Sequence, residues 1–87
     1  MKTIEQIKEK IAILRQEAEN LQVIVDTYQY EIETVINEKR YGAEWLAVWL
    51  VTKNQYLAEH KTELDLTRKE IETLEWVLLE ATGEVKE

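Results

Sequence analysis

The residues of this chain that could support chemistry are its carboxylates and one histidine. There is no cysteine, so a zinc site with His and Cys ligands within one chain is excluded. A di-iron helical bundle needs Glu-x-x-His repeats, and none occurs. His60 follows Glu59 and precedes Glu63 by three residues. We interpret it as a polar histidine in the core or in an interface; across a dimer axis it could form a pH-sensitive layer.

The carboxylates give only weak support for a magnesium site. Glu72-Thr73-Leu74-Glu75 matches the Glu-x-x-Glu spacing with which all-helical nucleotide pyrophosphatases hold magnesium, but no convincing second motif faces it. The chain also has no glycine-rich phosphate loop, nucleophile motif or Ser/His/Asp set. We therefore expect no enzymatic activity, no cofactor and no metal, and a metal-dependent nucleotide hydrolase is the least favoured function.

The apolar residues give a much stronger signal, because they alternate by three and four along two segments. In the first segment the alternation is that of a coiled-coil-like helix, and its members are Ile4, Ile7, Ile11, Leu14, Ala18, Leu21, Val25, Tyr28, Ile32 and Val35. Thr3 to Gln6 fits a capping box that would start this helix. The second segment continues the alternation from Ala43 to Ala81, interrupted only by the polar residues Lys53, His60 and Thr67.

The turn between the segments is predicted at Gly42. Lys39 and Arg40 would lie in the last turn of the first helix and Glu44 in the first turn of the second, the signs that the helix dipole favours. Gly42 would take the left-handed conformation that ends a helix, and Gly83 would end the second one. The alternatives are one unbroken helix through Gly42, and a break of the second helix near Thr52, where residues 52–55 fit another capping box.

The predicted fold is therefore an all-α, antiparallel two-helix hairpin. We expect a single domain over residues 1–87, with helix one at 3–40, a turn at 41–43, helix two at 43–82 and a frayed tail at 83–87. Pairing the helices about the turn sets Ile7 against Leu78, Leu21 against Leu64 and Ile32 against Lys53.

More apolar side chains lie near the turn than the seam of a two-helix hairpin can bury. Left exposed, such a surface would invite aggregation, so we predict that it is an interaction surface formed by Trp45, Trp49, Tyr56, Ile24, Ile36, Val48 and Tyr41. The preferred partner is a second copy, giving a homodimer in which two hairpins pack near their turns into a four-helix bundle. The alternative is a different protein anchored on the tryptophans.

The charge of the chain narrows the partners further. The net charge is −7, which argues against direct binding of nucleic acid or of an anionic membrane. Glu19, Asp26 and Glu33 recur every seven residues and form an acidic face. We interpret this face as solvated surface; alternatively, it makes the chain an acidic nucleic-acid mimic or an inhibitor that binds a basic protein surface.

The sequence thus favours a non-enzymatic, homodimeric adaptor, assembly factor or small regulator. One form of this hypothesis is a phage or mobile-element product that binds and blocks a host protein. The first five residues lack the apolar core of a signal peptide, and the apolar run at 43–51 is too short to span a membrane. We therefore expect a cytoplasmic location.

Overall fold

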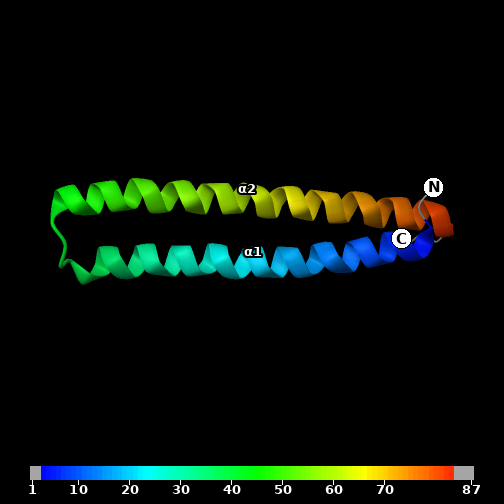
Figure 1. The fold of residues 1–87 in the computed structure, drawn as a ribbon, viewed down its shortest axis with the longest axis horizontal. Coiled ribbons are helices and arrows are strands. Elements are labelled where there is room, and N and C mark those ends of the chain that lie inside the picture. The colour runs from blue at the N-terminus through cyan, green and yellow to red at the C-terminus, as the bar shows by residue number, and fades with distance from the viewer. Residues whose placement is uncertain (1–2, 84–87) are drawn as a thin grey trace.

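The computed structural model, which describes residues 3–83, is an antiparallel hairpin of two long helices (Figure 1). Helix α1 spans Ile4–Glu38 and helix α2 spans Ala43–Thr82. The shape is a rod of 60 × 26 × 16 Å with a radius of gyration of 18.9 Å, against about 12 Å for a compact domain of this length. The prediction of an all-α two-helix hairpin is confirmed, and no helix runs unbroken through Gly42.

Local sequence signals set the start of α1 and the end of α2. The hydroxyl of Thr3 accepts a hydrogen bond from the Gln6 backbone N–H at 3.2 Å, and the Gln6 side chain accepts one from the Thr3 N–H at 2.9 Å. This is the predicted capping box. Gly83 ends α2 in the left-handed conformation, with φ of 71°, also as predicted. The rest of the expected frayed tail, residues 84–87, lies outside the described residues.

The turn differs from its prediction. Helix α1 ends at Glu38, and Lys39, not Gly42, takes the left-handed conformation, with φ of 56°. Gly42 is extended, with φ of −66°, and is the N-cap residue of α2. Lys39 and Arg40 therefore lie beyond the last turn of α1. The reason is distance: packed helices lie about 8–10 Å apart, and the three residues 40–42 can span about 10 Å when extended.

Helix α2 continues through the second potential capping box without a break. The hydroxyl of Thr52 donates to the carbonyl oxygen of Val48, one turn earlier, at 3.2 Å. It therefore acts as an ordinary threonine within a helix and starts no new one. The alternative of a break near Thr52 is wrong because the apolar alternation keeps its phase there.

Polar contacts between the helices fix their register. Near the turn, Lys53 Nζ lies 3.3 Å from a carboxylate oxygen of Glu31, close to the predicted pairing of Lys53 with Ile32. Toward the other end, Arg68 donates to the side-chain oxygen of Gln22 at 2.7 Å. Arg15 pairs with Glu75 in the same region. In both pairs the α2 residue lies nearer the C-terminal end of α2 than the predicted register places it, because the long arginine side chains reach along the rod.

The core occupies only one half of the rod. The buried side chains are those of Ile7, Ile11, Leu14, Val25, Leu64 and Thr67. All of them lie in what we call the open half, residues 3–25 and 64–83. In the turn half, residues 26–63, no side chain is buried. Its seam residues are at best half-buried, among them Tyr28, Ile32, Val35, Leu50 and Leu57.

The conformation of Gly42 yields a first prediction. An added side chain there would meet no atom within 4 Å, and an N-cap position favours aspartate over glycine. We expect Gly42→Asp to stabilise the protein by about 0.5–1 kcal/mol, through capping and through a less flexible unfolded chain. Thermal unfolding followed by circular dichroism measures this as a rise in Tm of about 2–6 °C.

Lys39→Gly is the matching variant, because it relieves a left-handed residue that carries a side chain. It should also raise Tm. A fall in Tm for Gly42→Asp would show that Gly42 itself occupies the left-handed region.

Candidate interaction surface

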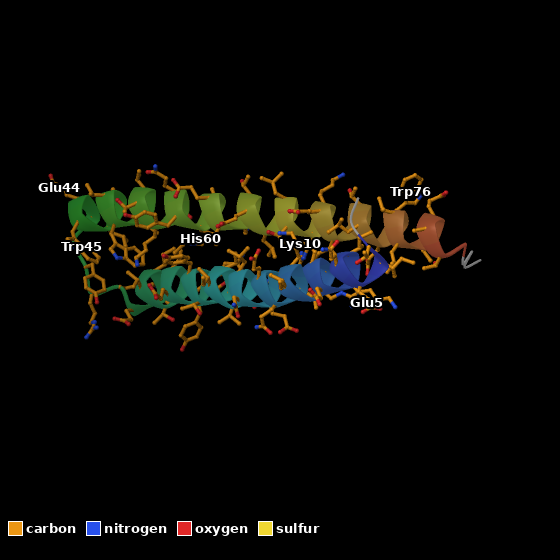
Figure 2. All side chains as sticks on the ribbon, turned by 45° about the vertical axis from the view of Figure 1, so that its right-hand side comes forward. Glu5, Lys10, Glu44, Trp45, His60 and Trp76 are labelled. Carbon is orange, nitrogen blue, oxygen red and sulfur yellow. The ribbon has the colours of Figure 1, made fainter. Side chains whose placement is uncertain are left out.

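Three aromatic rings stack from the turn onto the first turns of α2. The ring of Tyr41 lies 4.5 Å from that of Trp45, and Trp45 lies 5.8 Å from Trp49, with interplanar angles of 26° and 18°. Trp45 and Trp49 are four residues apart and so share one side of the helix. Figure 2 shows Trp45 at the turn end of α2, far from Trp76. We call Tyr41, Trp45 and Trp49 the aromatic ladder.

A cation lies at each end of the aromatic ladder. The Arg40 guanidinium lies 5.6 Å from the Tyr41 ring centroid, and Lys53 Nζ lies 5.7 Å from that of Trp49. The Tyr41 hydroxyl, followed by the Glu38 carboxylate, raises the pKa of Arg40 above its usual value. The Arg40 guanidinium also forms an ion pair with the Glu38 carboxylate at 2.6 Å, so this cation has a carboxylate partner at the turn.

Lys53 connects the aromatic ladder to α1. Its ammonium group lies 5.3 Å from the Tyr28 ring centroid as well as beside Trp49, and it pairs with Glu31. A half-buried lysine is costly unless it is paired, and here two rings and a carboxylate surround it. In the sequence Lys53 was only a polar interruption of the seam; its spacing of four residues from Trp49 was the signal for this contact.

His60 extends the cluster of rings between the helices. Its ring lies 5.4 Å from that of Tyr28, which in turn lies 6.3 Å from Tyr56. His60 Nδ1 lies 2.7 Å from the carbonyl oxygen of Tyr56, so a protonated Nδ1 donates a hydrogen bond within α2. His60 is half-buried. It thus lies at the seam, where the sequence analysis interpreted it as a polar core or interface residue.

The predicted interaction residues lie on more than one side of the rod. Ile24 borders a groove together with Glu63 and Thr67, which places the Ile24 edge of α1 beside the Tyr56–Glu63 edge of α2. We call this side the aromatic face. Its α1 edge runs through Ile24, Thr27, Glu31 and Thr34. Its α2 edge runs through Trp45, Trp49, Thr52 and Tyr56.

Two predicted residues do not belong to the aromatic face. Ile36 follows Arg15 and Gln22 at multiples of seven residues, and these two contact Glu75 and Arg68 along the opposite edge. Ile36 therefore lies on the opposite edge. Val48 is 70% exposed on the outer side of α2.

Sequence reasoning missed one apolar residue of this outer side. Val51 is 69% exposed and borders a shallow apolar hollow with Ala47, Val48 and Thr52. Its spacing of three residues from Val48 was the available signal.

The acidic candidates lie apart from the aromatic face. Glu19, Asp26 and Glu33 are exposed on α1, and none of them takes part in an ion pair within residues 3–83. Glu75 of the Glu-x-x-Glu motif pairs with Arg15. Within the same residues, no group of three or more His, Asp and Glu side chains could hold a metal ion.

The surroundings of Lys53 yield a second prediction. Lys53→Ala removes the side-chain stem and the cation between two rings, which should cost about 1–2 kcal/mol of unfolding free energy in urea. Lys53→Met keeps the packing and should change stability by less than about 0.5 kcal/mol. If methionine costs as much as alanine, the charge of Lys53, which serves both the ion pair with Glu31 and the two ring contacts, matters more than the packing of its stem.

Comparison with protein-family models, with curated proteins and with solved structures finds no match for this chain. Between residues 3 and 83, neither helix has a stretch long and apolar enough to cross a membrane.

Proposed function

We propose that this protein is a non-enzymatic protein–protein interaction module, and that a second copy of the chain covers its turn half. The observation that supports the proposal is the distribution of burial. The turn half contains two of the three tryptophans, yet none of its side chains is buried by the hairpin itself. The largest apolar side chains thus lie where the monomer cannot bury them, and a partner is needed to cover them.

The exposed area supports the same proposal. The accessible surface is 6851 Å², about a quarter above the roughly 5,400 Å² expected for a compact monomer of 10.4 kDa. A standard interface covers about 800 Å² on each partner. One interface over the turn half would therefore remove much of the excess.

The aromatic ladder is suited to binding because its rings are already ordered. Trp45 is 47% exposed and Tyr56 is 45% exposed, so both offer apolar area to a partner. Stacking fixes Tyr41, Trp45 and Trp49 before any partner arrives, which lowers the entropy lost on association. Tryptophan and tyrosine are also the residues that most often dominate binding energy in interfaces.

A second copy is the simplest partner for such a surface. Both helices contribute apolar residues to the turn half, so two hairpins packed there form four helices around a shared core. A twofold axis makes one surface serve both partners. The dimer would act as an adaptor, an assembly factor or a small regulator, with its remaining surface free for a target.

The acidic face supports a second candidate function. Glu19, Asp26 and Glu33 form no ion pair among the described residues, so they are available to a basic protein surface. Binding through them would weaken steeply with added salt. Binding through the aromatic ladder would depend on the tryptophans and little on salt.

The third prediction tests self-association by sedimentation at about 50 µM, where a dimer of micromolar affinity is largely associated. Wild type should sediment as a dimer and Trp45→Ala/Trp49→Ala as a monomer with unchanged helix content, because the double variant removes the ladder but no buried residue. Trp76→Ala is the matched control, since Trp76 is 62% exposed in the open half, and it should remain a dimer. A monomeric wild type would refute the proposal.

A further inference from the structure

We propose that the two copies pair through the aromatic face with their turns at opposite ends, so that the turn of one copy lies beside Glu63 of the other. This inference rests on the proposed function and specifies its geometry. It follows from the way charge changes along the aromatic face.

The aromatic face carries a net positive charge at the turn and is acidic beyond the ladder. Lys39 and Arg40 lie at its turn end and are exposed, together with one carboxylate, that of Glu38, which pairs with Arg40 at 2.6 Å. The α2 edge continues from Tyr56 by alternating steps of four and three residues, and its further members are Glu59, Glu63, Leu66 and Glu70. No lysine or arginine interrupts that run. The α1 edge adds Glu17, which borders the same groove as Glu63.

Two symmetric ways exist to stack one hairpin on another through this face. If the twofold axis runs along the rod, both turns lie at the same end, and α1 of each copy covers α2 of the other. Arg40 then lies near its own symmetry mate, and the acidic edges of α1 and α2 overlap in the open half. If the axis runs across the rod, the turns point apart, and each helix covers its own counterpart.

Only the second arrangement brings opposite charges together. It places Lys39 and Arg40 of each copy against the Glu59–Glu63 stretch of the other, while the acidic open halves extend away from each other. Apolar burial near the turn is available to both arrangements, so charge decides between them. Such pairs at the rim of an interface contribute little affinity each, but they do set orientation.

The same arrangement places small residues at the symmetry axis. Thr52 lies halfway between Arg40 and Glu63 along the chain, and it belongs to the aromatic face between Trp49 and Tyr56. Two Thr52 residues can approach closely, with the larger rings packed to either side. On α1, the small residue of this face nearest that level is Thr34: the contact of Glu31 with Lys53 sets residue 32 opposite Thr52, about 3 Å along the rod from Thr34.

Because the chain contains no cysteine, single cysteines report the arrangement by disulfide formation under mild oxidation. Thr52→Cys and Thr34→Cys should each crosslink to a second copy of the same variant in most molecules. A mixture of the two should give no crosslink between unlike variants. Thr73→Cys is the matched control: like Thr52, Thr73 bonds the carbonyl four residues earlier, but it lies outside the overlap and should not crosslink.

The outcomes separate this inference from the proposed function. Crosslinks formed only between Thr34→Cys and Thr52→Cys, from a protein that sediments as a dimer, would overturn the opposed geometry and leave the dimer intact. A dimer in which neither crosslink forms would place the interface on another side of the rod and would also overturn it. A monomer without crosslinks would refute both.

Charge reversal provides an independent readout. Arg40→Glu should weaken dimerisation about tenfold, because the twofold symmetry repeats the lost pair. Glu63→Arg alone should weaken it similarly, and the combined variant should restore the wild-type dissociation constant. Failure of the combined variant to recover would contradict the contact between the turn and Glu63.

Discussion

The structure depends on a geometric limit: two helices in contact can bury only one stripe of each. In the open half, the apolar stripe is narrow enough for the other helix to cover it, and aliphatic residues such as Ile11 and Leu14 are buried. In the turn half the stripe is wider than one neighbouring helix can cover. Rings at and beside the seam, those of Tyr28, Trp49 and Tyr56, hold the helices in register without being enclosed.

Polar residues at the seam of α2 follow from the same limit. Where the seam is partly open to water, a lysine can place its stem between Tyr28 and Trp49 and still reach Glu31. A fully apolar residue there would add to an already exposed surface. In the open half, where the seam is buried, the polar seam residue is the small Thr67. Its hydroxyl donates a hydrogen bond to the Glu63 carbonyl at 2.9 Å and is thereby satisfied.

Sequence reasoning succeeded where the determining contacts are local. The capping box of Thr3 involves residues three apart, and the helix phase is a repeating pattern, so both could be predicted. The left-handed Lys39 could not, because its conformation depends on the gap between two packed helices. Ile24 and Ile36 were assigned to one surface because both flank the seam; only the contacts across the seam show that they flank it on opposite edges.

In the proposed dimer, the acidic residues of the chain would have two different roles. Glu19, Asp26 and Glu33 lie away from the aromatic face and stay in water whether or not the chain associates, which favours solubility. In the proposed dimer, Glu63 and Glu70 act differently: Glu63 lies beside the turn of the second copy, whereas Glu70 lies beyond that contact, where further carboxylates would repel their counterparts. The proposed contact would therefore end beyond Glu63. In the proposed dimer, charge would limit the extent and direction of a contact whose energy comes from the aromatic rings.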